Sequence, residues 1–155
     1  MQIEAFTTER LSPSRSLRGW QSYRLSARGL VIKPRGSEPF RASLRTYASQ
    51  RYRFSEVSIS PHVIASRPAS SAVRPNSYML SVINEGTVHV LQDGREAFAV
   101  AGDFIMVDTS RPLCVEATAL KVKSIDISGT RMREVLPQVE GLTAICISGH
   151  TPGGM

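Results

Sequence analysis

The chain has few of the residues that mark secreted or membrane-spanning proteins. Its 155 residues include only two cysteines and one tryptophan, and no stretch approaches the roughly 18 apolar residues of a spanning helix. The first residues, MQIEAFTTER, lack the basic and apolar segments of a secretion signal. We therefore expect a cytoplasmic protein with no membrane contact, in which Cys114 and Cys146 are reduced core thiols.

Acidic residues are scarce relative to basic ones. Lysine and arginine total 19, against 13 aspartates and glutamates, which gives a net charge of +6. Most of this excess is arginine in the first third of the chain. Arginine forms bidentate contacts with phosphate and stacks on nucleobases, so the excess favours an anionic partner. A solvated basic face is the alternative explanation.

Short apolar runs separated by turn residues dominate the centre of the chain. Residues 78–109 contain four such runs, with turn residues at 84–86, 93–94 and 101–103. Asp-Gly at 93–94 predicts a tight hairpin, because glycine adopts the positive φ that the turn needs. Alternation predicts further strands from residue 40, over 52–66 with a bend at Pro61, and over 113–117, 120–128 and 142–147. One mainly β domain, an antiparallel sandwich or barrel, is expected.

Two short helices are predicted outside these strands. Ser12 and Pro13 suit the N-cap and first position of a helix that runs to about Leu25. A second helix is expected over 130–136, where Pro137 ends it.

In the strand over 120–128, the apolar residues change from even positions to the odd positions Ile125 and Ile127. We expect a bulge near Ser124 to restore a single inward face. The bulge would place four polar residues on the outer face: Lys121, Lys123, Asp126 and Ser128. The apolar interior is expected to include Val88, Val90, Phe104, Met106 and Ile125.

An ordered series of motifs resembles the cupin-type sensor domain of AraC/XylS-type bacterial transcription regulators. The series is Gly86, Gln92-Asp93-Gly94-Arg95, Gly102-Asp103 and Asp108-Thr109-Ser110-Arg111-Pro112. The resemblance covers about residues 40–137. It implies a cupin-like antiparallel β-barrel of the jelly-roll type, with one short helix before it and one near its end. It also implies an effector-sensing and dimerisation domain of a cytoplasmic transcription activator.

The resemblance divides the chain into three parts. Residues 1–39 are expected to form a helix and an arginine-rich segment, 40–148 the sensor and dimerisation domain, and 149–155 a tail. The family contacts DNA through C-terminal helix-turn-helix motifs, so DNA binding is expected only through a domain absent from this chain. We expect a homodimer, with a candidate seam at Met132, Val135 and Leu136.

Metal-dependent cupin enzymes hold their metal with histidines and a glutamate inside the barrel. This chain has no His-x-His pair and no histidine directly after Gly102-Asp103, and His62 and His150 are remote from His89. A three- or four-ligand site is therefore not expected, and His89 is interpreted as a strand residue with satisfied hydrogen bonds. We predict no metal, no cofactor and no enzyme activity; a free-standing cupin enzyme is the alternative.

Two arginine pairs share the spacing Arg-x-x-x-Arg: Arg24 with Arg28, and Arg41 with Arg45. This spacing resembles the cyclic di-GMP motif of PilZ domains, whose arginines contact phosphates and guanine. The second PilZ motif, Asp/Asn-x-Ser-x-x-Gly, is similar to the stretch 126–129, which is one residue shorter. Some AraC-type regulators with both features respond to this dinucleotide.

The first pair is preferred because it lies where the helix passes into a loop, which can fold over a flat ligand. The expected cyclic di-GMP site, on the arginines and the outer barrel face, consists of Arg24, Arg28, Asp126 and Ser128. The second choice consists of Arg41, Arg45 and Trp20, although Arg41 and Arg45 would be about 13 Å apart on a regular strand. A small apolar or aromatic effector inside the barrel, or a domain without any ligand, is the alternative.

Overall fold

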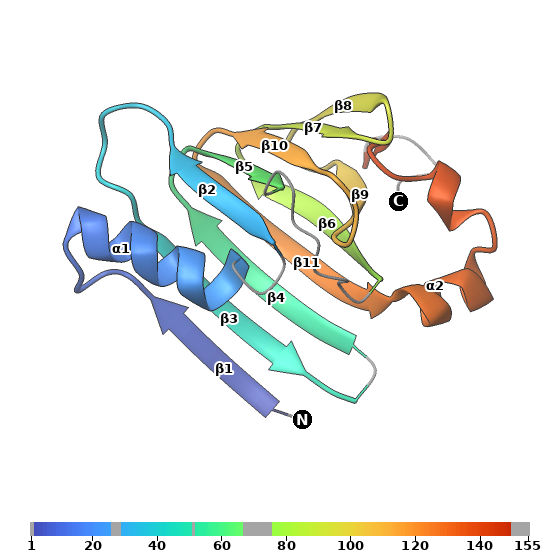
Figure 1. Cartoon of the computed structure of the whole chain (residues 1–155), viewed down its shortest axis with the longest axis horizontal. Helices are drawn as coiled ribbons and strands as arrows, with labels where there is room; N and C mark the ends of the chain where they lie inside the picture. The colour runs from blue at the N-terminus through green and yellow to red at the C-terminus, as the bar shows by residue number, and fades with distance from the viewer. Residues whose placement is uncertain (1, 26–28, 51, 67–75, 150–155) are drawn as a thin grey trace.

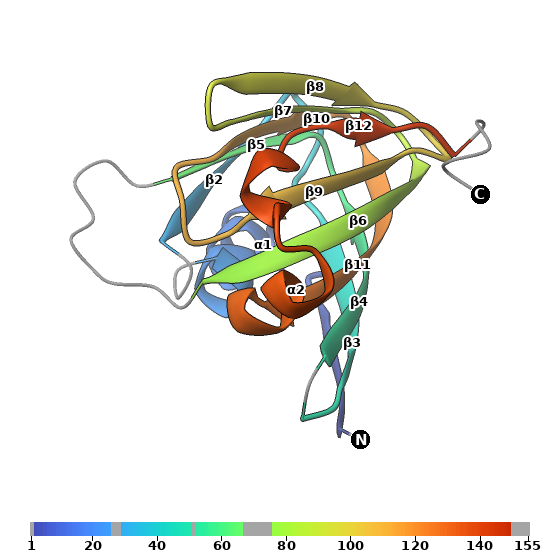
Figure 2. The same ribbon diagram turned by 90° about the vertical axis from the view of Figure 1, so that its right-hand side faces the viewer.

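The computed structural model describes residues 2–25, 29–50, 52–66 and 76–149. In this part of the chain, two antiparallel sheets pack against each other (Figures 1 and 2). The seven-stranded sheet has the order β1-β3-β4-β11-β6-β9-β12, and the five-stranded sheet has the order β2-β5-β10-β7-β8. The predicted mainly β, antiparallel architecture is therefore confirmed.

The strands of the seven-stranded sheet are β1 (Gln2–Thr7), β3 (Ala42–Ala48), β4 (Tyr52–Ile59), β6 (Ser77–Glu85), β9 (Phe104–Asp108), β11 (Leu120–Ser128) and β12 (Cys146–Ile147). Those of the five-stranded sheet are β2 (Leu30–Pro34), β5 (His62–Ser66), β7 (Val88–Gln92), β8 (Arg95–Ala99) and β10 (Cys114–Ala117). The helical segments are α1 (Pro13–Trp20), the π-helical η1 (Gln21–Leu25), α2 (Gly129–Val135) and the 3-10 helix η3 (Val139–Gly141).

The tight turn predicted at Asp93-Gly94 is present. Asp93 and Gly94 have φ angles of 54° and 73°, as a two-residue hairpin turn between β7 and β8 requires. The predicted bend at Pro61 is also present, and it has a larger role than expected. The chain leaves β4 at Ile59 and enters β5 at His62, so this bend carries it from one sheet to the other.

Two strands lie in the segment that the sequence analysis assigned to a helix and an arginine-rich stretch. β1 pairs with β3, and β2 pairs with β5. Residues before 40 therefore contribute one edge strand to each sheet (Figure 1).

The predicted first helix is present, and it changes geometry part-way. Ser12 caps α1 by accepting a hydrogen bond from the Arg15 amide at 3.4 Å. After Trp20 the chain continues as the wider η1 turn. The Gln21 side chain anchors this turn to β2, because its amide group donates to the Leu30 carbonyl at 2.7 Å and accepts from the Ile32 amide at 2.9 Å.

Two apolar cores hold the domain together. The larger one fills the space between the sheets, where Trp20, Val88 and Val90 are at most 5% exposed. The smaller one lies on the outer face of the seven-stranded sheet, where α2 packs over β11 and β6 (Figure 2). It consists of Tyr78, Met106, Met132 and Val139. The expectation that Met106 belongs to the interior between the sheets was therefore wrong.

The expected bulge near Ser124 was also wrong. The register shift of β11 against β6 lies between Lys121 and Val122, and regular pairing continues from there to Ser128. Cross-strand partners share a face, so Asp126 lies on the same face as its partner Met79, which lines the interior. Asp126 is therefore on the inner face and Ile125 on the outer one, the reverse of the prediction.

Among the described residues, no helix is long and apolar enough to cross a membrane.

Candidate functional site

A cavity of about 150 Å³ lies between the two sheets. Its walls are mostly apolar and come from both sheets and from α1 and η1. Trp20 closes it on the helix side, and Val90 and Val107 are among the strand residues that line it. The polar side chains in its lining are Arg24, His62, Ser81, Thr109 and Ser124. Such a pocket, apolar with a few polar groups, suits a small molecule.

A row of hydroxyl groups crosses the inner face of the seven-stranded sheet. Thr46 on β3 lies 3.2 Å from Ser55 on β4, and Ser124 on β11 lies 2.7 Å from Ser81 on β6. The register places Ser55 opposite Ser124, so the four residues lie on one line across four strands. Within each pair, the two hydroxyl groups satisfy each other's hydrogen-bonding needs in an otherwise apolar layer. Because Ser81 and Ser124 also line the cavity, they offer hydrogen bonds to a ligand there.

His62 contributes a ring nitrogen from the five-stranded sheet. The residue is 2% exposed, and its Nδ1 lies 2.8 Å from the Ser60 carbonyl oxygen. Burial lowers the pKa of His62, because it disfavours the charged ring, and the hydrogen bond to Ser60 opposes this only in part. The neutral ring therefore donates from Nδ1 to Ser60, and Nε2 is an acceptor on a residue that lines the cavity.

Charged residues gather at one end of this cavity. Arg24, on η1, is half-buried and lines it. Asp126 lies two residues beyond the cavity residue Ser124 on the inner face of β11, and its partner on β4 is Arg53. Burial and Glu4 raise the pKa of Tyr23, and the charges of Arg24 and Arg53 oppose this rise, so both arginines lie near the Tyr23 side chain. We call Arg24, Arg53 and Asp126 the Arg24 cluster.

The other members of the predicted site lie differently. Ser128 is exposed, and its side chain caps α2 by accepting from the Arg131 amide at 3.3 Å. Arg28 lies outside the described residues. Arg53 was not predicted as a site residue; its place directly opposite Asp126 depends on strand pairing, which the sequence does not display.

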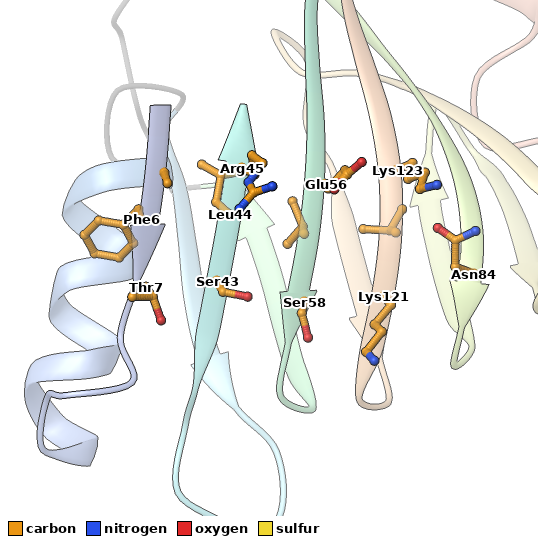
Figure 3. A pocket seen from close by; sticks show the side chains of 13 residues that line it. Phe6, Thr7, Ser43, Leu44, Arg45, Glu56, Ser58, Asn84, Lys121 and Lys123 are labelled. Atoms are coloured by element: carbon orange, nitrogen blue, oxygen red, sulfur yellow. The ribbon is translucent and has the colours of Figure 1, made fainter. Parts of the chain in front are cut away.

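The second arginine pair faces away from the cavity. The predicted alternation of β3 is confirmed, because Ala42 and Leu44 are buried whereas Arg41 and Arg45 are exposed. Arg45 lies in a shallow groove on the outer face of the seven-stranded sheet, in the row that continues with Glu56 and Lys123 (Figure 3). Trp20, which the second choice grouped with this pair, is 1% exposed and lines the inner cavity. It therefore does not belong to the same surface.

The motif residues Gln92 and Asp108 hold one end of the barrel together. The Gln92 side chain donates to the Asp108 carbonyl at 2.7 Å and accepts from the Asp108 amide at 2.8 Å. Asp108 is 2% exposed, and its carboxylate accepts from Asn76 at 2.9 Å and from the Ser110 hydroxyl at 2.6 Å. These residues join β7, β9 and the start of β6, so their motif is structural.

The turn between β7 and β8 is tied to the C-terminal segment by a second group of motif residues. Asp93 forms an ion pair with Arg111 at 2.7 Å and accepts from the Thr143 hydroxyl at 2.7 Å. Arg95 donates to the Thr143 carbonyl at 2.7 Å and to the Glu140 carbonyl at 3.0 Å. We call Asp93, Arg95, Arg111 and Thr143 the Asp93 clamp.

The histidines and cysteines form no metal site in the described part of the chain, where no three His, Cys, Asp or Glu side chains converge. His89 contacts the Glu96 carboxylate and stacks on Phe98, with ring centroids 4.2 Å apart. The expected strand histidine with a satisfied hydrogen bond is thus confirmed. Cys114 and Cys146 are free thiols, as expected. His150 lies outside the described residues.

Comparison with known proteins gives the family. Residues 26–133 match the AraC-binding-like domain model. The chain belongs to this family. The match covers more than half of the chain and includes the motif series from Gly86 to Pro112. The domain is therefore the sensor domain of an AraC-like transcription regulator, and the coarse functional prediction is confirmed.

Solved structures support the fold. The chain superposes on the AraC-like transcriptional activator CuxR with a TM-score of 0.82 at 12% identity, over 95% of this chain and 55% of that one. It thus spans about half the length of CuxR. A weaker match is the EutQ protein of Clostridium difficile, with a TM-score of 0.45 at 11% identity over 57% of this chain and 64% of that one. Another is a cupin domain of an XRE family regulator from Enterobacter cloacae, with a TM-score of 0.40 at 12% identity over 64% of this chain and 96% of that one. No curated protein sequence matches the chain. The CuxR match confirms the cupin-like fold.

Proposed function

We propose that this domain binds cyclic di-GMP as the effector of a cytoplasmic AraC-type activator, and that the ligand contacts the Arg24 cluster. Arg24, which lines the inner cavity, and Arg53 and Asp126, which lie opposite each other on neighbouring strands near its end, support this proposal. Guanidinium groups form bidentate bonds with phosphate and stack on bases, and a carboxylate accepts hydrogen bonds from guanine N–H groups. The single observation that carries the proposal is that Arg24 and Asp126 both lie on the inner side of the seven-stranded sheet.

This site differs from the predicted one in its position. The prediction placed Asp126 on the outer barrel face, whereas its partner Met79 lines the cavity. A dinucleotide is far larger than a 150 Å³ cavity, so it would lie across the end of the cavity and not within it. Arg28 stays in the proposal as the second arginine of the motif, and Ser128 as a neighbour at the end of β11.

Calorimetric titration of the domain with cyclic di-GMP tests this proposal. We expect saturable binding that weakens as salt is added, because screening reduces the arginine–phosphate interaction. Asp126→Asn removes the acceptor charge and should weaken binding, whereas Glu56→Gln, on the outer groove, should leave it unchanged. If the unmodified domain binds no cyclic di-GMP, the proposal is wrong.

A small aromatic or apolar effector inside the cavity is the second candidate. The cavity volume and its apolar walls favour it, because an engineered apolar cavity of about 150 Å³ in another protein holds a benzene molecule. His62 Nε2 and the Ser81–Ser124 pair would supply hydrogen bonds to one polar substituent.

Thermal-shift measurements distinguish the two ligands. Ser124→Leu fills part of the cavity and should abolish the stabilisation by a small aromatic effector, while Arg24→Lys should reduce the stabilisation by cyclic di-GMP. A cyclic di-GMP response that is lost in Ser124→Leu and kept in Arg24→Lys would move the dinucleotide away from the Arg24 cluster.

We further propose that the domain acts by binding and not by catalysis, that it needs no cofactor, and that the regulator contacts DNA through residues outside this domain. Metal analysis of the purified protein tests the first two statements. A stoichiometric transition metal would favour the cupin-enzyme alternative.

A further inference from the structure

β1 is one of the two edge strands of the seven-stranded sheet. It pairs with β3 on one side only, and no described element pairs with its other side (Figures 1 and 3). All of its side chains except that of Phe6 are exposed, and Ile3 is 60% exposed. A free strand edge presents unpaired backbone groups, which form a template for another strand.

The pairing pattern shows which backbone groups face this free edge. The Thr8 amide donates to the Ala42 carbonyl at 3.0 Å, which identifies Thr8 and Ala42 as a hydrogen-bonded pair. Hydrogen-bonded pairs alternate along an antiparallel ladder, so Glu4 and Phe6 also direct their backbone groups to β3. Ile3, Ala5 and Thr7 consequently direct their N–H and C=O groups outward.

This edge lacks most of the usual protection against pairing. Proteins protect edges with lysine and other charges, proline, bulges, very short strands or a covering helix or loop. The sequence of β1, QIEAFT, contains no lysine and no proline, and its single charged residue, Glu4, accepts a hydrogen bond from Tyr23 at 3.1 Å. By contrast, β2 includes Lys33 and Pro34, β12 has two residues, and β8 lies beside β12 (Figure 2).

We propose that two copies of this domain associate by antiparallel pairing of their β1 strands, about a two-fold axis at Ala5. In this register the two Ala5 residues meet at the axis, and Ile3 of each copy lies opposite Thr7 of the other. Both pairs consist of residues whose backbone groups face outward, so they form hydrogen-bonded pairs. The register centred on Glu4 would instead place two carboxylates opposite each other, which is unfavourable.

The resulting dimer has one continuous sheet that crosses both copies. The outer groove of Figure 3 is lined by Ala5 and Thr7 at its β1 side, so the two grooves meet at the axis. One six-residue strand pair is smaller than the interfaces of roughly 1,200–2,000 Å² that stable complexes bury, so the association is weak and concentration-dependent. It does not depend on the effector or on the Arg24 cluster.

This interface differs from the predicted seam on α2. Of the three seam residues, Met132 is 5% exposed and belongs to the smaller core. Val135 and Leu136 are 73% and 38% exposed. The α2 seam is therefore the competing outcome of the test.

Sedimentation velocity over low to high micromolar concentrations is the first measurement. Ala5→Pro removes an outward N–H and leaves the hydrogen bonds to β3 intact, because proline is tolerated on edge strands. We expect the unmodified domain to dimerise, Ala5→Pro to stay monomeric with an unchanged thermal midpoint, and Leu136→Ser to dimerise like the unmodified domain. A monomeric unmodified domain, or dimerisation that is lost in Leu136→Ser and kept in Ala5→Pro, would overturn the proposal.

Disulfide cross-linking gives an independent result if Ala5→Pro fails to fold. In a background with Cys114→Ser and Cys146→Ser, Ala5→Cys should form a covalent dimer under mild oxidation, because hydrogen-bonded pairs place their Cα atoms about 5.5 Å apart. Ile3→Cys, which lies opposite threonine, should form none. Equal cross-linking of both variants would contradict the register.

Discussion

Arg24 and Arg45 belong to the same kind of five-residue motif, yet they lie on opposite sides of the seven-stranded sheet. Arg24 is half-buried beside the inner cavity, whereas Arg45 is exposed on the outer groove. A guanidinium in a partly enclosed site interacts more strongly with an anion than one in open water, because the effective dielectric constant is lower. The spacing of a motif thus says little about its function until the burial of each residue is known.

The largest difference between inward-facing and outward-facing residues is expected in how their substitution changes the free energy of unfolding. Val90 is 2% exposed in the inner core, and its neighbour Leu91 points outward with 40% exposed. Val90→Asp buries an unpaired carboxylate and should cost several kcal/mol of the free energy of unfolding, measured by urea denaturation. Leu91→Asp should change it far less; equal effects would show that the inner face is misassigned.

A smaller contrast is expected between a shielded and an open ion pair. Asp93→Asn weakens the Asp93 clamp, in which the aspartate side chain is 13% exposed, and should cost about 1–3 kcal/mol. Glu116→Gln removes an ion pair with Arg35 whose side chains are 44% and 41% exposed, and should cost less than about 1 kcal/mol. Chemical denaturation of the two variants checks the order, and a reversed order would mean that the clamp does not hold the C-terminal segment.

The pH dependence of stability should report the burial of His62. Burial lowers the pKa of His62 in the folded state, so the unfolded state binds the proton more readily. The free energy of unfolding should therefore fall as the pH is lowered below about 6.5, the ordinary histidine pKa. His62→Gln should reduce this dependence, as thermal unfolding at several pH values would show. An unchanged slope in His62→Gln would contradict the assignment.

Local chemistry made the central strands predictable. The Asp93-Gly94 turn and the alternating runs on either side of it carry their own signal, and the structure places β6 to β9 where the pattern predicts them. β1 was missed because it is stabilised by pairing with β3, some forty residues later, and its own sequence shows no clear alternation.

The misplacement of Asp126 has a physical cause as well. Ile125 and Ile127 were interpreted as inward residues, and this required a bulge. They are half-buried on the outer face instead, and Ile127 packs against the smaller core that α2 covers there. Alternation along a strand usually indicates that the apolar residues face the interior. Here α2 buries part of the outer face, so apolar residues face outward, and the pattern of a single strand does not reveal this.

The central claim is that Arg24, and not Arg45, belongs to the effector site. Calorimetric titration with cyclic di-GMP of the unmodified domain, Arg24→Lys and Arg45→Lys tests it directly, because lysine keeps the charge and loses the planar fork. We expect Arg24→Lys to lose at least about tenfold in affinity, the equivalent of 1.4 kcal/mol, and Arg45→Lys to bind like the unmodified domain. Full affinity in Arg24→Lys together with a loss in Arg45→Lys would contradict the account and place the ligand on the outer groove.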